Sequence, residues 1–151
     1  MTPGFSSPAG RPSGNQPSQM PTIPKPEKVE YLRNDHLREE LVDVEAQNWA
    51  ERFKDVKPTQ LRRFYEHVLA LKRRLDESPN PQQLFEAIRA EFKMLKAKAV
   101  YTAGRNNKLQ PLLQFFVNHT AAVKTLKDFE AFLKHFEAVV AFHKFYGEGT
   151  R

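Results

Sequence analysis

The sequence predicts an all-α fold, a compact antiparallel bundle of about five helices that follows a disordered, proline-rich N-terminal tail. From residue 34 onward, apolar residues recur at intervals of three and four. Glycine is almost missing between residues 34 and 147, and the remaining prolines stand at positions 58, 79, 81 and 111. Those positions suit helix starts or loops, so none of these prolines has to lie inside a helix.

The N-terminal tail is predicted from its composition. Residues 1–30 hold seven of the eleven prolines and three of the six glycines, with serines and glutamines between them. Such a segment buries too little apolar surface to offset the entropy lost on ordering. We expect two units: a disordered tail over residues 1–33 and a helical bundle over residues 34–151.

The helices of the bundle follow from apolar spacing. The first is expected over residues 36–55, with Ala46, Trp49 and Phe53 on one face and Leu37 with Leu41 on another. The last is expected to be capped by Thr125 and closed by Gly147. Short loops between helices imply antiparallel neighbours. The four later helices are expected over residues 58–77, 81–103, 109–122 and 126–146.

Composition narrows the function. The 151 residues include 24 Lys and Arg against 18 Asp and Glu, a formal net charge of +6 that favours an acidic or nucleic-acid partner. Cysteine is absent, which excludes disulfides and thiolate nucleophiles and is compatible with a reducing cytoplasm. No stretch has the length of apolar residues that a membrane helix or a signal peptide needs, so we expect a soluble, cytoplasmic protein.

The cations follow helical spacing. Arg62 and Arg63 flank inward-turning apolar residues at the start of the second helix, a rigid position suited to an anionic backbone. Arg73 lies in line with Arg62, eleven residues further along the helix. In the third helix a narrow wedge of charge lies along one margin of the apolar face, formed by Arg89, Lys93 and Lys96.

The third helix runs into a basic segment, residues 96–108, that contains glycine and one aromatic ring. A basic loop with an accessible ring, here Tyr101, can clamp phosphates and stack on a base or sugar. An ordinary helix end capped by Gly104 explains the same residues. The candidate RNA-binding residues are Arg62, Arg63, Arg73, Arg89, Lys93, Lys96, Lys98, Arg105 and Lys108.

The last helix carries a histidine and two phenylalanines of interest. His143 lies on the broad apolar face and is expected to be a packed, hydrogen-bonded core residue. Phe142 and Phe145 lie off that face and are expected to form a subunit interface, with burial against the first helix as the alternative.

Two other functions remain open. Arg62 and His67 have the spacing of a HEPN-type helical ribonuclease, in which His acts as general acid or base, but five helical residues place them about 140° apart. A protein-only scaffold explains the bundle and the phenylalanines, but not the one-sided cations. No metal or other cofactor is expected, since none of the five histidines has a Glu three residues before it or another His four residues away.

Three segments together resemble the small helical subunit of the type III-A CRISPR effector, the Csm complex: residues 60–65 (QLRRFY), 96–105 (KAKAVYTAGR) and 136–144 (FEAVVAFHK). The resemblance covers roughly residues 45–146. It implies a non-catalytic subunit of an antiviral ribonucleoprotein, stacked in several copies along the guide RNA–target RNA duplex. The subunit is expected to bind the RNA backbone without reading bases and to contact other effector subunits and copies of itself.

The resemblance also carries over a basic surface, formed by Arg62, Arg63, Lys96, Lys98 and Arg105. Phe142 stands where the family leads us to expect a tyrosine.

Overall fold

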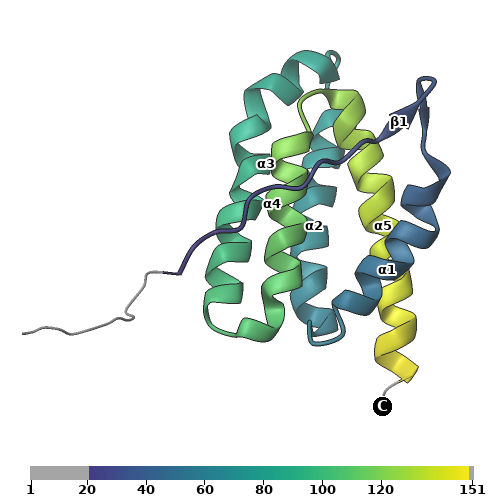
Figure 1. The fold of residues 1–151 in the computed structure, drawn as a ribbon. Helices are drawn as coiled ribbons and strands as arrows, with labels where there is room; N and C mark the ends of the chain where they lie inside the picture. Colours follow the sequence, from purple (N-terminus) through teal and green to yellow (C-terminus); the bar gives the residue numbers. More distant parts are fainter. Residues whose placement is uncertain (1–20, 150–151) are drawn as a thin grey trace, which may run out of the picture.

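The computed structural model describes residues 21–149 (Figure 1). Over this range the chain forms five α-helices, two short 3-10 helices and one small two-stranded sheet, which confirms the all-α prediction. The α-helices are α1 (Val44–Arg52), α2 (Pro58–Asp76), α3 (Pro81–Gly104), α4 (Gln110–Ala122) and α5 (Leu126–Gly149).

Helices α2 to α5 begin where the sequence supplies a start signal. Pro58 and Pro81 are the first residues of α2 and α3, where the missing N–H would have no intrahelical partner. The hydroxyl of Thr125 accepts a hydrogen bond from the backbone N–H of Asp128 at 3.1 Å, which confirms it as the cap of α5. The predicted stop at Gly147 is wrong. No described glycine has a positive φ, so Gly147 continues the helix instead of forming a left-handed cap.

The first predicted helix is wrong over residues 36–43. The chain there makes an antiparallel hairpin of β1 (Leu32–Arg33) and β2 (His36–Leu37), followed by the 3-10 helix η2 (Glu39–Val42). Asn34 and Asp35 take left-handed φ values of 54° and 69°, the conformation of a tight two-residue hairpin turn. The apolar residues before position 43 therefore anchor the hairpin and η2 to the bundle and do not form a second helix face.

The tail prediction is wrong for residues 21–33, while residues 1–20 lie outside the described residues. Residues 21–31, here called the strap, run in extended form across α4 to β1 (Figure 1). Asn118 holds the strap at Glu27, accepting from its backbone N–H at 2.8 Å and donating to its carboxylate at 3.1 Å. Tyr31 is only 4% exposed. Composition misses these contacts because the partners lie on α4, about 90 residues away.

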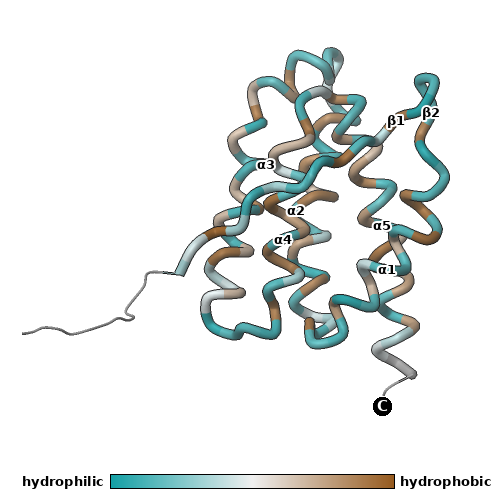
Figure 2. The backbone as a smooth tube through the Cα atoms, in the orientation of Figure 1, coloured by the Kyte–Doolittle hydropathy of each residue, from teal (hydrophilic) through white to brown (hydrophobic). Residues whose placement is uncertain are grey.

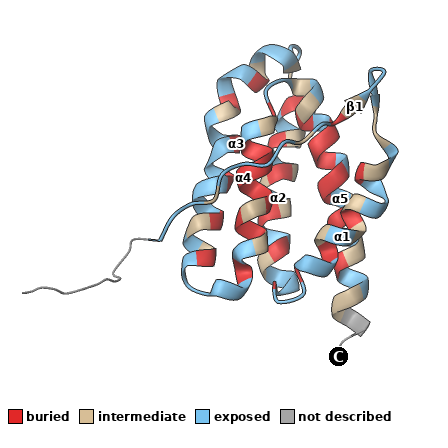
Figure 3. Cartoon of the chain, in the orientation of Figure 1, coloured by how far each residue is buried: buried red, intermediate tan, exposed pale blue. Residues whose placement is uncertain are grey.

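The core lies among all five helices. Helix α1 packs on α5, α3 packs on α4, and α2 contacts both α3 and α5. Hydrophobic and buried positions recur on the helix sides that face one another (Figures 2 and 3). Phe115 of α4 is the hub of an aromatic cluster with Trp49, Phe53, Phe116, Phe132 and Phe136.

Candidate nucleic-acid interface

Helix α3 carries four of the nine predicted cations, and a fifth, Arg105, is its C-terminal cap. Its start is fixed by Pro81 and by the Asn80 side chain, which accepts a hydrogen bond from the backbone N–H of Gln83 at 3.2 Å. Its buried face consists of Phe85, Ile88, Phe92, Leu95, Ala99 and Ala103. The opposite side of the helix is left to solvent, with cations along both of its margins.

One margin lies beside α4. The Lys93 ammonium donates to the backbone carbonyl of Thr120, near the end of α4, at 3.1 Å. Arg89 and Lys96 share this margin by helical spacing, and neither side chain forms an ion pair within the described part of the chain. This margin therefore offers three positive charges, none of which forms an ion pair within residues 21–149.

The other margin lies beside α2 and is tied to it by side chains. The Lys98 ammonium donates to Nδ1 of His67 at 2.8 Å, and Nε2 of His67 donates to the backbone carbonyl of Glu91 at 3.1 Å. Arg74 pairs with the carboxylate of Glu91 at 2.7 Å. These contacts fix Lys98 in place and neutralise the one acidic residue on this margin.

His67 is held as a neutral ring. Burial lowers its pKa from the ordinary value, and the nearby Lys98 ammonium lowers it further. Its two ring nitrogens are occupied by Lys98 and Glu91, both on α3, whereas Arg62 faces α5. The structure therefore does not bring together the two residues of the alternative ribonuclease motif.

Between the margins, the exposed side of α3 carries small residues together with the exposed side chains of Met94 and Tyr101. Ala90, Ala97 and Gly104 follow one another every seven residues and are all exposed, with Glu86 as the acidic residue of this side. A side-chain carbon added at Gly104 would meet nothing within 4 Å. We call this surface the α3 face: a strip of small residues, Ala90, Ala97 and Gly104, between the cations Arg89, Lys93 and Lys96 on one margin and Lys98 and Arg105 on the other.

The arginines of α2 divide between two sides of that helix. Arg63 lies in line with Arg74, on the side next to α3, and so extends the α3 face. Arg62 instead lines a groove of about 860 Å³ between α2 and the end of α5, together with Val140 and His143. Arg73 lies in line with Arg62 and shares its side. The structure thus separates Arg62 and Arg73 from the other predicted residues.

Lys108 follows α3 in the short 3-10 helix η3 (Asn107–Leu109), where it is exposed. Its backbone N–H donates to the side chain of Asn106 at 3.0 Å, which caps this turn. The position is at the end of the α3 face, close to Arg105 in sequence.

The predicted residues of α5 have different surroundings. His143 is buried and its Nε2 donates to the carbonyls of Val56 at 2.9 Å and Phe53 at 3.2 Å, which confirms a hydrogen-bonded core histidine. Phe142 is partly buried against the core, whereas Phe145 is 72% exposed. Of these two phenylalanines, only Phe145 has most of its ring exposed to solvent.

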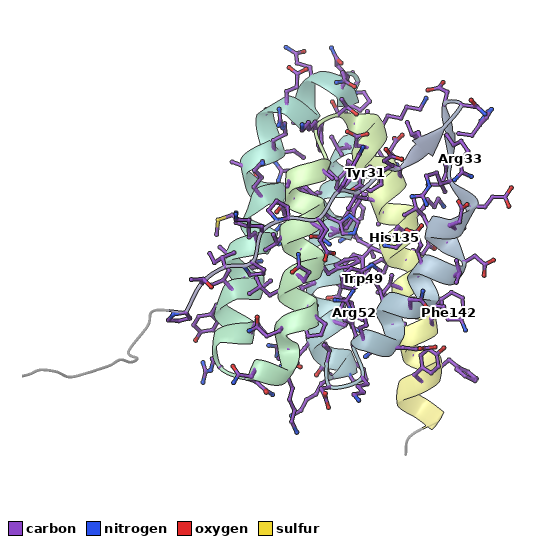
Figure 4. All side chains as sticks on the ribbon, viewed as in Figure 1. Tyr31, Arg33, Trp49, Arg52, His135 and Phe142 are labelled. Atoms are coloured by element: carbon purple, nitrogen blue, oxygen red, sulfur yellow. The ribbon has the colours of Figure 1, made fainter. Side chains whose placement is uncertain are left out.

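A second polar cluster was missed by the sequence analysis. It lies at a cavity of about 440 Å³ that is lined by residues of the strap, β1, η2, α1, α4 and α5. Figure 4 labels two residues of the cluster, Tyr31 and His135. The Tyr31 hydroxyl donates to Nδ1 of His119 at 2.7 Å, and Nδ1 of His135 donates to the carbonyl of Leu41 at 2.6 Å. Burial lowers the pKa of His119 well below its ordinary value, lowers that of His135, and raises that of Tyr31.

The histidines of this cluster pack against aromatic rings of the core. The rings of His119 and His135 lie 5.2 Å apart, and both are enclosed by Phe115. Within the described residues, no group of three His, Cys, Asp or Glu is placed to hold a metal ion. The only sequence signal for the cluster is the pair of histidines inside apolar stripes of α4 and α5, and their partners lie 88 to 94 residues away in the chain.

Comparison with known families identifies the chain. A family model described as Csm2 Type III-A matches residues 36–149, more than half of the sequence. The chain belongs to the Csm2 family. It is therefore a small subunit of the type III-A CRISPR effector complex and associates with the other Csm subunits. No curated protein and no solved structure matches the chain.

For this Csm2-family chain, the range matched by the family model shows which structural elements belong to the family. The match begins at the first residue of β2, so it contains all five α-helices and the whole α3 face. The strap and β1 lie outside it. None of the described helices is both long enough and apolar enough to span a membrane.

Proposed function

We propose that this subunit is non-catalytic and binds the backbone of the guide RNA–target RNA duplex through the α3 face, in several copies stacked along the duplex. The observation that carries the proposal is the arrangement of cations along both margins of a strip of exposed small residues. Arg63 adds to one margin, and Lys108 continues the surface beyond Arg105.

The chemistry of an A-form duplex suits such a surface. Its major groove is too narrow for side chains, so proteins contact phosphates and 2′-hydroxyls by shape and charge. At Ala90, Ala97 and Gly104 a sugar–phosphate strand can approach the helix closely, on either side of the exposed Tyr101 ring. In RNA-guided effectors the sequence is read by base pairing, and a subunit that binds without sequence preference is what this division of work requires.

The modest charge of one copy is compatible with tight attachment of the assembly. Each phosphate contact releases counterions and makes binding salt-dependent, and contacts multiply when several linked copies bind one duplex. Phe145, together with the partly buried Phe142, is proposed as the contact to a neighbouring subunit, because a large exposed ring near the end of α5 is otherwise unpartnered by the core.

The non-catalytic role is supported by the histidines. His67, His119, His135 and His143 each bond a protein group through a ring nitrogen, and burial lowers the pKa of the first three. A general acid or base needs a free nitrogen within reach of the substrate. His67 uses both ring nitrogens, and His119, His135 and His143 are buried, so none of these four presents a free nitrogen to a substrate.

The test is a matched pair of triple variants. Arg63→Ala, Lys96→Ala and Arg105→Ala remove three charges from the α3 face, while Lys54→Ala, Lys134→Ala and Lys144→Ala remove three from the α1–α2 loop and α5. Fluorescence anisotropy with a labelled guide–target duplex at low salt should show at least roughly tenfold weaker binding for the first set and little change for the second. Equal losses in both sets would contradict the α3 face as the binding surface.

A further inference from the structure

Tyr101 differs from the other tyrosines of the chain in having an exposed ring. It is 68% exposed, on the α3 face. Tyr31 is buried, Tyr65 packs edge-on against Phe136, and the Tyr146 hydroxyl donates to Glu51 at 3.0 Å. Exposing a large ring on a rigid helix forgoes burial that the fold could have used.

The ring is held in place while its face stays open. Nη1 of Arg105 donates to the Tyr101 hydroxyl at 2.8 Å, and the guanidinium carbon lies 5.5 Å from the ring centroid. In the Arg52–Trp49 pair of α1, the guanidinium carbon is only 3.9 Å from the centroid and covers the ring. Arg105 therefore contacts the hydroxyl end of Tyr101 and leaves space for a flat group to stack.

Cations flank the ring along the helix. Lys98 lies one turn before Tyr101 and Arg105 one turn after it, so each is about 5 Å away along the axis. Lys98 uses one of its three N–H donors on His67, and Arg105 uses one of its five on Tyr101. Both retain donors for an anion. Met94, also exposed, extends the apolar surface seven residues before the ring.

We propose that Tyr101 is a stacking platform for an unpaired RNA base, with Lys98 and Arg105 binding the phosphates on either side of that nucleotide. The inference rests on the proposed function and adds to backbone binding a preference for RNA with an unpaired nucleotide. A ring between two cations suits a nucleotide better than an apolar protein anchor, since the base supplies a π face and its neighbours supply negative charge. Stacking tolerates any base, so it is compatible with binding that ignores sequence.

The experiment compares two RNA duplexes and four proteins, all full length. One duplex is fully paired, and the other carries a single bulged 2-aminopurine, whose fluorescence falls when it stacks. The proteins are the wild type, Tyr101→Ala, Tyr101→Phe and, as a control that truncates an exposed apolar side chain outside the α3 face, Val44→Ala. Circular dichroism confirms that each variant is folded.

We expect the wild type to bind the bulged duplex more tightly than the paired one and to quench 2-aminopurine. Tyr101→Ala should lose the quenching and bind the bulged duplex roughly 5- to 100-fold more weakly, with the paired duplex unaffected. Tyr101→Phe and Val44→Ala should behave as the wild type.

Each other outcome has a distinct meaning. Wild-type affinity and quenching in Tyr101→Ala would overturn the stacking proposal and leave backbone binding standing. Failure of the wild type to bind either duplex at low salt would overturn the proposed function itself. If Tyr101→Ala binds both RNAs normally but no longer associates with other effector subunits, the ring is a protein contact and the proposal is wrong.

Discussion

Two regions of this molecule use the same residue types in opposite surroundings. Around the strap, Tyr31 and His119 are buried, and their hydrogen bond joins segments 88 residues apart. On the α3 face, Tyr101 is exposed, and its bond to Arg105 spans a single helical turn. Around the strap, the polar side chains bond one another and hold the fold together. On the α3 face, N–H donors and the face of the Tyr101 ring stay available for a partner.

The family match includes one of these two regions and leaves out the other. The α3 face lies inside residues 36–149, and the strap lies outside them. The cations of the α3 face thus belong to the part of the chain that makes it a Csm2 protein. The strap runs across α4 and is held to it by the side chains of Asn118 and Gln114.

The largest expected difference between the regions concerns Phe115, the hub of the aromatic cluster. Phe115→Ala should lower the free energy of unfolding by about 3–5 kcal/mol, because it leaves a cavity among buried rings. Tyr101→Ala, the matched aromatic truncation on the α3 face, should change it by less than about 0.5 kcal/mol. Urea denaturation measures both values, and similar losses would show that Tyr101 is part of the core.

A smaller effect is expected from one hydroxyl. Tyr31→Phe should lower the free energy of unfolding by about 1–3 kcal/mol, since Nδ1 of the buried His119 loses its donor. Tyr101→Phe removes an equivalent hydroxyl at the surface and should cost little. Equal urea midpoints for Tyr31→Phe and the wild type would mean that the strap does not depend on this bond.

The pH dependence of stability tests the role of the buried histidines near the strap. Burial lowers the pKa values of His119 and His135, so below about pH 6.5 the unfolded chain binds more protons than the folded one. The free energy of unfolding should therefore be highest above that pH and should decrease as the pH falls below it. The charged groups facing His135 are Glu45, which favours its protonation, and Arg38, which opposes it.

The double variant His119→Asn, His135→Asn tests this origin. Asparagine can still accept from Tyr31 and donate to Leu41, but it does not titrate. Thermal unfolding of this variant should lose less stability between pH 7 and 5 than that of the wild type. The exposed His36→Asn variant should retain the wild-type decline. If the double variant loses as much stability between pH 7 and 5 as the wild type, the loss arises from other titrating groups.

The predictable parts of the molecule are those set by local sequence. Apolar spacing and the start signals at Pro58, Pro81 and Thr125 are enough to place α2 to α5, because helix formation depends on neighbours within a turn or two. The hairpin turn at Asn34 and Asp35 was missed, since apolar spacing alone extended the helix back to residue 36. The strap was missed because its partner Asn118 is 91 residues away from Glu27.

The same limit applies to the candidate site. Helical spacing puts Arg89, Lys93 and Lys96 on one margin of α3, and the hydrogen bond of Lys93 to Thr120 shows that this margin lies beside α4. It cannot say which margin of α2 faces α5, so Arg62 and Arg63 were grouped although they point to different sides of the helix. Their separation depends on the packing of α5 against α2, a contact between distant segments.

The salt dependence of RNA binding tests the central claim most directly. The logarithm of the association constant for a guide–target duplex, plotted against the logarithm of salt concentration, has a slope set by the number of phosphates neutralised. Removing Arg63, Lys96 and Arg105 together should make the slope shallower by about three, whereas the Lys54, Lys134 and Lys144 variant should keep the wild-type slope. An unchanged slope in the first variant, or an equal reduction in both, would contradict RNA binding by the α3 face.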